Sequence, residues 1–388
     1  MPTYTAVPLA HPRVRRTAVA RVEIVPSRGG CGDDDHDFAT LQALARRLAL
    51  LHGCEYSGVY QGARPRGEGR TYFVPQETLL RSHAQLLDVA HDRDLFGGVV
   101  PHPFVATKVI SHPTVDGDAL VPQGWSHGLS GRLSGAVLPG FAVFSRADAR
   151  RACMQLLRLG PLRVKPAHGK GGNGQALVAD PGALEAALQQ IDDAELARHG
   201  CVLEQHLEEA TTRSIGTVDC AGLRISYVGT QRTTRNRDGA EVYGGSDLVA
   251  VRGGYDALGA IGLDEGLRQA VRLARRYHAA VQGAYPEFFA SRVNYDVIQG
   301  VDRDGVPHCG VLEQSWRIGG ASPAEISALE AFAADPGLQV VEASSHEFHG
   351  PHAPPDGARV HYRDIDPQWG PMTKYSTLRA HGYPAQHH

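Results

Sequence analysis

The sequence has no cysteine pair of the Cys-x-x-Cys type, and its six cysteines are scattered along the chain. This pattern argues against a disulfide framework or a zinc knuckle and is typical of buried thiols in a reducing compartment. The chain also lacks an apolar run long enough for a transmembrane helix and the basic-then-apolar N-terminus of a signal peptide. We therefore expect a cytoplasmic protein without a membrane partner.

Charge of one sign is also missing, because 39 lysines and arginines nearly balance 42 aspartates and glutamates and leave a net charge of −3. A nucleic-acid-binding domain usually carries a basic surface, so we expect no nucleic acid partner. Arginine outnumbers lysine, which makes each lysine in a motif more informative. Glycine is abundant, with 45 residues in a chain of 388, as expected of a loop-rich α/β enzyme with two or three packed subdomains.

Hydrophobic periodicity and turn residues predict alternating helices and strands. The predicted helices are 38–52, 76–96, 146–158, 181–191, 264–282 and 323–333. The predicted strands are 22–25, 162–166, 175–178, 202–205, 293–299 and 309–314, with a hairpin over 213–232. Residues 111–140 and the tail 346–388, rich in glycine, proline, serine or histidine, are predicted to be irregular.

Lys165 ends a predicted strand directly before the glycine-rich segment 169–174. Backbone N–H groups of such a loop can approach phosphate oxygens closely, and the ammonium points at whatever the loop holds. No Gly-Lys-Ser/Thr closes the loop, and a strand follows it, so it is neither a Walker A loop nor a dinucleotide fingerprint. An ordinary hairpin remains the alternative.

A second element follows at Glu204-Gln205-His206-Leu207-Glu208-Glu209, where a strand ends in an acidic linker. Such a hinge can offer backbone groups to an adenine edge and carboxylates to ribose hydroxyls. Plain solvated acids are the alternative.

The third element carries the strongest chemical pattern. Asp296 and Glu313 lie on two strands joined by a turn, and neighbouring carboxylates suit Mg²⁺, which prefers carboxylates together with substrate phosphates. Ser315 and Arg317 follow Glu313 at two-residue steps and share its face if the strand continues. Arg317 would then supply a fixed charge for a developing oxyanion. The alternative is a structural ion pair between Glu313 and Arg317.

In this order, the lysine, the glycine-rich hairpin, the acidic hinge and Glu-x-Ser-x-Arg-x-Gly-Gly resemble the ATP-grasp superfamily over roughly residues 100–330. The whole chain is similar to bacterial members described as biotin-carboxylase-like. The resemblance implies an α+β fold in which two lobes clasp ATP, preceded by an N-terminal α/β region. The implied domains are an N-terminal region over 1–100, the first part of the core and a linker over 101–160, a small lobe over 161–212, a large lobe with the metal site over 213–330, and an irregular C-terminal extension over 331–388.

The resemblance also assigns roles to residues of this chain. Lys165 and Arg317 are the implied catalytic residues. The implied nucleotide-binding residues are Lys108, Lys165, Gly169, Lys170, Gly171, Gly172, Asn173, Gly174, Glu204, Gln205, Leu207 and Glu209. The implied ligands of Mg²⁺ or Mn²⁺ are Asp296, Glu313 and Ser315. Ser315 departs from the family, which usually has asparagine there, and no clear match exists for the acid that binds the ribose.

The implied reaction is that of an ADP-forming carboxylate–amine ligase. ATP activates a small-molecule carboxylate as an acyl phosphate, an amine attacks it, and no side-chain nucleophile is needed. Two alternatives stay open, namely bicarbonate activation of the biotin carboxylase type and nucleotide binding without catalysis. Whether the chain forms a homodimer also stays open. His346, His349 and His352 could suggest a metal site, but the prolines around them predict a loop without fixed spacing.

Overall fold

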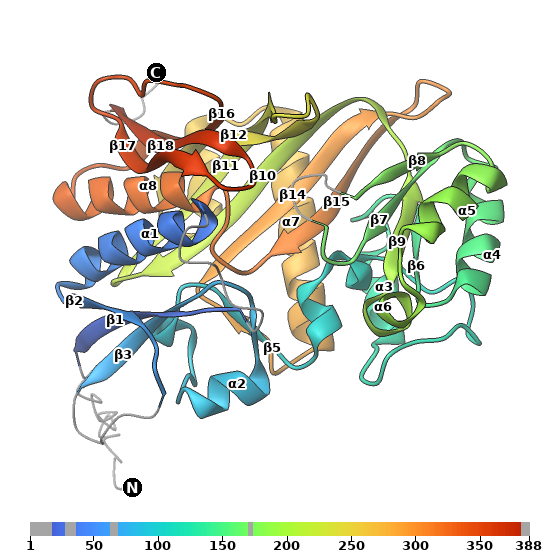
Figure 1. The fold of residues 1–388 in the computed structure, drawn as a ribbon, viewed down its shortest axis with the longest axis horizontal. Coiled ribbons are helices and arrows are strands. Elements are labelled where there is room, and N and C mark those ends of the chain that lie inside the picture. The colour runs from blue at the N-terminus through green and yellow to red at the C-terminus, as the bar shows by residue number, and fades with distance from the viewer. Residues whose placement is uncertain (1–17, 28–35, 63–68, 170–173, 382–388) are drawn as a thin grey trace, which may run out of the picture.

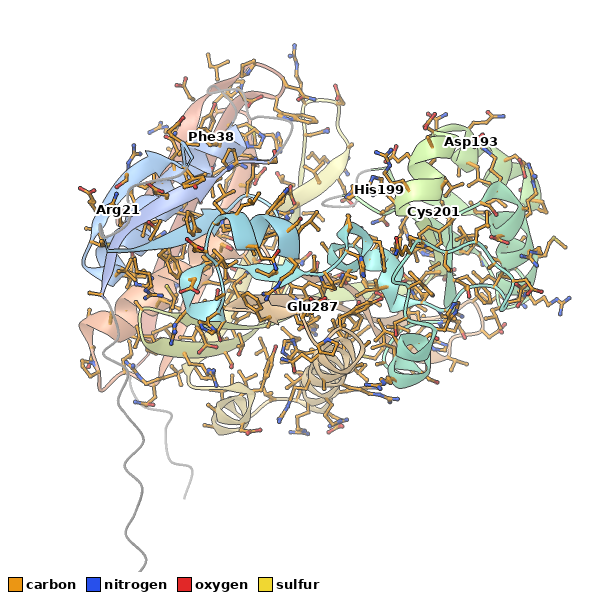
Figure 2. All side chains as sticks on the ribbon, turned by 90° about the horizontal axis from the view of Figure 1, so that it is seen from below. Arg21, Phe38, Asp193, His199, Cys201 and Glu287 are labelled. Carbon is orange, nitrogen blue, oxygen red and sulfur yellow. The ribbon has the colours of Figure 1, made fainter. Side chains whose placement is uncertain are left out.

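The computed structural model describes residues 18–27, 36–62, 69–169 and 174–381. Four sheets organise this part of the chain, and the two larger ones have four and eight strands. Figure 1 shows the four-stranded sheet with its helices at one end of the molecule and the N-terminal sheet at the other, while the eight-stranded sheet extends from above the N-terminal sheet across the middle. In Figure 2, Cys201 and Asp193 mark the part that contains the four-stranded sheet, far from Arg21 and Phe38 in the N-terminal part.

The N-terminal part is a small parallel sheet covered by a helix. Strands β1 (Val19–Val25), β2 (Glu55–Val59) and β3 (Arg70–Pro75) pair in the order β2-β1-β3, and the predicted amphipathic helix is α1 (His36–His52). A second small sheet combines β4 (Leu79–Leu80), β5 (Gly98–Val100) and β13 (Phe289–Ala290).

The predicted helix over 76–96 is wrong, because only α2 (Arg81–Leu86) forms there. The chain turns away at Asp88, which adopts a positive φ of 55°. The Asp94 carboxylate then accepts hydrogen bonds from the N–H groups of Ala90 and His91, in place of the carbonyls that would accept them in a helix. Acidic residues that bond the backbone in this way stabilise turns at the expense of helix. The short 3₁₀ helix η1 (Asp92–Asp94) closes this turn.

The segment between β5 and the four-stranded sheet consists of short helices joined by loops. It contains the 3₁₀ helices η2 (Pro103–Ala106) and η3 (Lys108–Ser111) and the helix α3 (His127–Leu133). The expectation of a mostly irregular stretch over 111–140 agrees with this arrangement.

The small lobe is an antiparallel sheet in the order β6-β9-β7-β8. Its strands are β6 (Gly140–Val143), β7 (Leu162–Pro166), β8 (Ala176–Val178) and β9 (Cys201–Gln205), and its helices are α4 (Arg146–Leu156), α5 (Pro181–Gln189) and α6 (Asp193–His199). Ser145 and Asp180 cap α4 and α5 through their side chains, as N-terminal capping residues do. The predicted elements of this region are confirmed. The sheet also includes β6, which lies before the predicted start at residue 161.

The large sheet runs in the order β15-β14-β10-β11-β12-β16-β18-β17. The strands that the motifs predicted are β10 (Glu208–Cys220), β11 (Leu223–Arg235), β14 (Arg292–Val301) and β15 (Pro307–Ser315), and β12 (Glu241–Arg252) adds to them. Helix α7 (Glu265–Ala284), preceded by the 3₁₀ helix η4 (Tyr255–Ile261), packs its Tyr277 on one face. Helix α8 (Ser322–Ala334) packs with α1 on the other face.

The prediction of an irregular C-terminal extension over 331–388 is wrong. Strands β16 (Val340–His349), β17 (Arg359–Asp366) and β18 (Gly370–His381) extend the large sheet. Several inward positions here are polar and find partners, so apolar periodicity gave little signal. Lys374 on β18, for example, is buried and pairs with Asp37 on α1 at 2.8 Å and with Glu347 on β16 at 3.1 Å. No helix within the described residues is long and apolar enough to cross a membrane.

Buried His361 on β17 leads to a prediction about acid stability. Burial lowers its pKa from 6.5 to about 3, and Arg47, Arg359 and Lys374 add to the effect. Below pH 6.5 the unfolded chain therefore binds a proton at this histidine, whereas the folded chain does not bind it until about pH 3. As the pH falls through that window, this residue should lower the free energy of unfolding by up to about 1.4 kcal/mol per pH unit.

His361→Gln removes the titration and retains a side chain that can hydrogen-bond to Ser376, the present partner of His361. Urea unfolding of both proteins at pH 7, 5 and 4 should show a flatter loss of stability for the variant. An equal loss in both proteins would contradict the assignment.

Candidate functional site

Lys108 brings together three segments that are far apart in the sequence. It begins η3, and its buried ammonium lies 2.6 Å from the Glu313 carboxylate on β15. The same nitrogen donates a hydrogen bond of 2.8 Å to the carbonyl of Gly169, at the start of the glycine-rich segment. Lys108 therefore joins two other candidate residues of the sequence, Gly169 from the small lobe and Glu313 from the large lobe.

Lys165 and Glu204 form a second pair inside the small lobe. They lie on the neighbouring strands β7 and β9, and the ammonium donates a short hydrogen bond to the carboxylate. Glu204 is only 2 % exposed, and burial alone would raise its pKa. The charge of Lys165 and the His112 ring outweigh burial and lower the pKa of Glu204 to about 2. Glu204 therefore stays ionised and keeps the Lys165 ammonium in a fixed place.

His112, which follows η3, is a site residue that sequence reasoning missed. Its Nε2 lies 3.1 Å from the second oxygen of Glu204. A Cβ at Gly140 would come within 2.8 Å of the His112 ring, so the glycine lets the ring approach β6 closely. His112 stands in no motif that sequence alone could have singled out.

The predicted hinge is only partly brought to this cluster. Side chains alternate along a strand, so Gln205 points to the face of the sheet opposite Glu204, and its N–H donates to the Pro139 carbonyl at 2.9 Å. Leu207 is buried, whereas Glu209 is exposed with a positive φ of 48°. The predicted loop residues Lys170, Gly171, Gly172 and Asn173 lie outside the described residues, between Gly169 and Gly174.

The predicted pairing of the two acids is confirmed, since Asp296 on β14 stands directly opposite Glu313 on β15. Burial raises the pKa of Asp296, and the facing Glu313 raises it further, to about 6, against the hydrogen bonds from Gln231 and Asn294. Two facing carboxylates suit a divalent cation. No group of three His, Cys, Asp or Glu residues in the described ranges could hold a metal alone, so a cation here would need ligands from a bound molecule. His346, His349 and His352 likewise do not form a group that could hold a metal.

Arg317 does not share the strand face of Glu313. Strand β15 ends at Ser315, and Arg317 donates a hydrogen bond of 2.6 Å to the Ile318 carbonyl while its Nε lies 3.5 Å from the Glu77 carboxylate. The alternative of a Glu313–Arg317 pair is not observed, because Glu313 contacts Lys108 instead. The condition under which Arg317 would share the face of Glu313, a strand that continues, is therefore not met. The Gly319-Gly320 segment follows, and Tyr243 packs so closely on Gly320 that a Cβ would lie 2.4 Å from its ring.

Ser315 is also engaged within the protein. Its Oγ accepts a hydrogen bond of 3.1 Å from Nη1 of Arg292, and its carbonyl accepts another of 3.0 Å from the same nitrogen. Arg292 in turn pairs with Glu325 in the first turn of α8. Sequence reasoning missed both, because an acid in the first turn of a helix is ordinarily explained by the helix dipole.

Solved structures resemble the chain over most of its length. A biotin carboxylase from Campylobacter jejuni in complex with β-γ-ATP has a TM-score of 0.53 at 13 % identity, covering 93 % of this chain and 88 % of that one. An N5-carboxyaminoimidazole synthetase from Staphylococcus aureus in complex with ADP has a TM-score of 0.51 at 12 % identity, covering 93 % of both chains. The biotin carboxylase domain of the Hydrogenobacter thermophilus 2-oxoglutarate carboxylase has a TM-score of 0.51 at 13 % identity, covering 93 % and 86 %. This likeness confirms the predicted ATP-grasp fold.

No curated protein matches the chain in sequence. A family model does match, and it spans residues 27–376, from before α1 to β18, so it includes both lobes and every site residue described above. The chain, which has the ATP-grasp fold, therefore belongs to the family described as "Protein of unknown function (DUF3182)".

Proposed function

We propose that the chain is an ADP-forming ligase that uses ATP to activate a carboxylate as an acyl phosphate for attack by an amine. The observation that carries this proposal is the pair of buried ammonium groups beside paired carboxylates. Lys108 and Lys165 are each paired with a carboxylate, and Asp296 faces Glu313 next to Lys108. Two fixed cations and a place for a divalent cation suit a triphosphate.

In this proposal the nucleotide lies between the lobes. Lys165, fixed by Glu204, and Lys108 contact phosphate oxygens. Leu207 and the backbone around Gln205 line the adenine, and Glu209 is a candidate for the ribose. Asp296 and Glu313 would hold Mg²⁺ or Mn²⁺, which supplies charge neutralisation at the phosphates when bound. Lys108 would then exchange Glu313 for a phosphate oxygen.

The chemistry needs positioning more than a nucleophile from the protein. A substrate carboxylate oxygen attacks the γ-phosphorus, the bond to the β-phosphate oxygen breaks, and ADP leaves. The amine then attacks the carbonyl carbon, inorganic phosphate departs, and the amine nitrogen loses a proton. Arg317, near the glycine pair that follows β15, is the candidate for holding the carboxylate and its developing oxyanion.

Lys165→Met should weaken the binding of a non-hydrolysable ATP analogue roughly tenfold to a hundredfold, because a hydrogen bond to a charged group contributes about 1.5–3 kcal/mol. The same change leaves Glu204 buried without its partner, which should cost about 3–5 kcal/mol of stability. Titration calorimetry and urea unfolding measure the two effects separately.

The double variant Lys165→Met, Glu204→Gln is the matched control. It removes both charges, so stability should recover toward that of the wild type, whereas affinity should stay low. Unchanged affinity in the single variant would remove Lys165 from the nucleotide site.

Glu313→Gln should retain binding of the ATP analogue but reduce turnover at least about a hundredfold, on the order of 2.7 kcal/mol of transition-state stabilisation. The variant keeps the shape of the side chain and removes one negative ligand. Phosphate and ADP release, screened across amino acids and dipeptides with and without bicarbonate, provides the assay and distinguishes an amide-forming ligase from bicarbonate activation.

Asp304→Asn makes the same acid-to-amide change at an exposed position of the β14–β15 turn and should leave turnover unchanged. Full ATP-dependent product formation by Glu313→Gln would show that the paired carboxylates are structural. A wild-type protein that binds the analogue but turns over no substrate of the panel would favour nucleotide binding without catalysis.

A further inference from the structure

The surroundings of Ser315 differ from those of a metal ligand. One nitrogen of Arg292, Nη1, donates to the Ser315 Oγ at 3.1 Å, to the Ser315 carbonyl at 3.0 Å and to the Arg317 carbonyl at 2.8 Å. A lone pair of the serine hydroxyl that could face a cation is therefore already used by a cationic donor.

Arg292 is held in this place from the other side. It is 1 % exposed, and Glu325, which is fully buried, accepts hydrogen bonds from its Nε and its Nη2. Burial disfavours the charge of the guanidinium, but Glu325 and its neighbours hold the pKa of Arg292 above the ordinary value. The side chain is thus a permanent positive charge that cannot swing away.

The network continues to the paired carboxylates. The Tyr227 hydroxyl contacts both Glu325 and the Asn294 side-chain oxygen, the latter at 2.9 Å. The Asn294 amide nitrogen donates a hydrogen bond of 2.9 Å to Asp296. Asn294 is also the residue directly opposite Ser315 on the neighbouring strand. Arg292 therefore lies four residues before Asp296 on β14, beyond the Asn294–Ser315 pair that is next to the place proposed for the divalent cation.

Electrostatics decides what a second cation would meet at this position. A divalent ion bound to the Ser315 hydroxyl would lie within a few ångströms of the guanidinium, which is 1 % exposed, so the repulsion between the two charges is screened less than in water. Moving the guanidinium away would leave Glu325 buried without its partner, which is costly. Ser315 is therefore unsuited to hold a metal as long as Arg292 is in place.

We infer that this site is built for one divalent cation per nucleotide, held by Asp296 and Glu313, and that Arg292, anchored by Glu325, supplies the fixed positive charge next to it in place of a second ion. The inference rests on the proposed function. Arg292 is a positioning residue, because its side chain is 1 % exposed and two of its hydrogen bonds fix the backbone from Ser315 to Arg317.

The test is a Mn²⁺ titration of the full chain in the presence of saturating β,γ-methylene-ATP, with free Mn²⁺ followed by electron paramagnetic resonance. The wild-type complex should bind one Mn²⁺. Ser315→Ala should bind one as well, with an affinity within about twofold, and Ser315→Asn should not create a second site. Two Mn²⁺ ions in the wild type, reduced to one in Ser315→Ala, would overturn the inference.

A double variant tests the part played by Arg292 itself. Ser315→Asn combined with Arg292→Met offers an amide ligand and removes the cation, so a second Mn²⁺ should bind if the variant folds, as checked by thermal unfolding. A folded double variant that still binds one ion would show that Arg292 does not exclude the second. If the double variant does not fold, the two single variants still decide the stoichiometry.

The same titration separates this inference from the proposed function. If the wild-type protein does not bind the nucleotide analogue with or without Mn²⁺, the proposed function fails. If the analogue binds together with two ions, the function stands and only the single-cation inference is lost.

Discussion

The Lys108 ammonium contacts Glu313 on the large sheet and the Gly169 carbonyl at the edge of the small lobe. Through this one side chain, the segment between the N-terminal part and the small lobe contacts both the large sheet and the small lobe. A buried ammonium is costly unless it is paired and hydrogen-bonded, so the positions of the large sheet and the small lobe depend on each other here. Nucleotide phosphates are the kind of group that could take over such a contact, because they too offer anionic oxygens.

Paired burial of charge recurs around this contact. Lys165 with Glu204 lies in the small lobe, and Arg292 with Glu325 lies beneath the end of β15. Each pair fixes one cation by a carboxylate that hydrogen-bonds it within the fold. Pairs of this kind contribute little net stability, but removing one partner is strongly destabilising. Their effect is to hold charges at defined points before any ligand arrives, which is what electrostatic catalysis requires.

Much of this arrangement could be predicted from the sequence where local signals agreed. The Asp180-Pro181 helix start, the hairpin around Ala221-Gly222 and the pairing of Asp296 with Glu313 follow from capping, turn chemistry and strand spacing, and the structure confirms them. Strands β16 and β18 were missed, because buried Lys374 and Ser345 break the apolar pattern and are stabilised by partners distant in the sequence.

Only the site residues that stand in local sequence motifs could be predicted. Glu313 was identified as a ligand candidate, but its contact with Lys108 joins residues about two hundred positions apart, and no local rule indicates it. Arg317 would share the strand face only if the strand continued, yet β15 ends two residues earlier, and Arg292 donates hydrogen bonds to the carbonyls of Ser315 and Arg317. Arg292 and His112 act through tertiary contacts alone, so composition and spacing could not reveal them.

Hydrogen–deuterium exchange of the full chain with and without Mg-ADP is the sharpest test of whether a nucleotide binds between the small lobe and the large sheet. We expect slower exchange in peptides covering β7 to β8, the end of β9, and the β14–β15 pair, because amides there become buried under the ligand. Peptides of α4, which packs on the apolar face of β9, and of β17, at the far edge of the large sheet, should exchange at unchanged rates. Protection confined to other regions, or no protection at saturating Mg-ADP, would contradict the account.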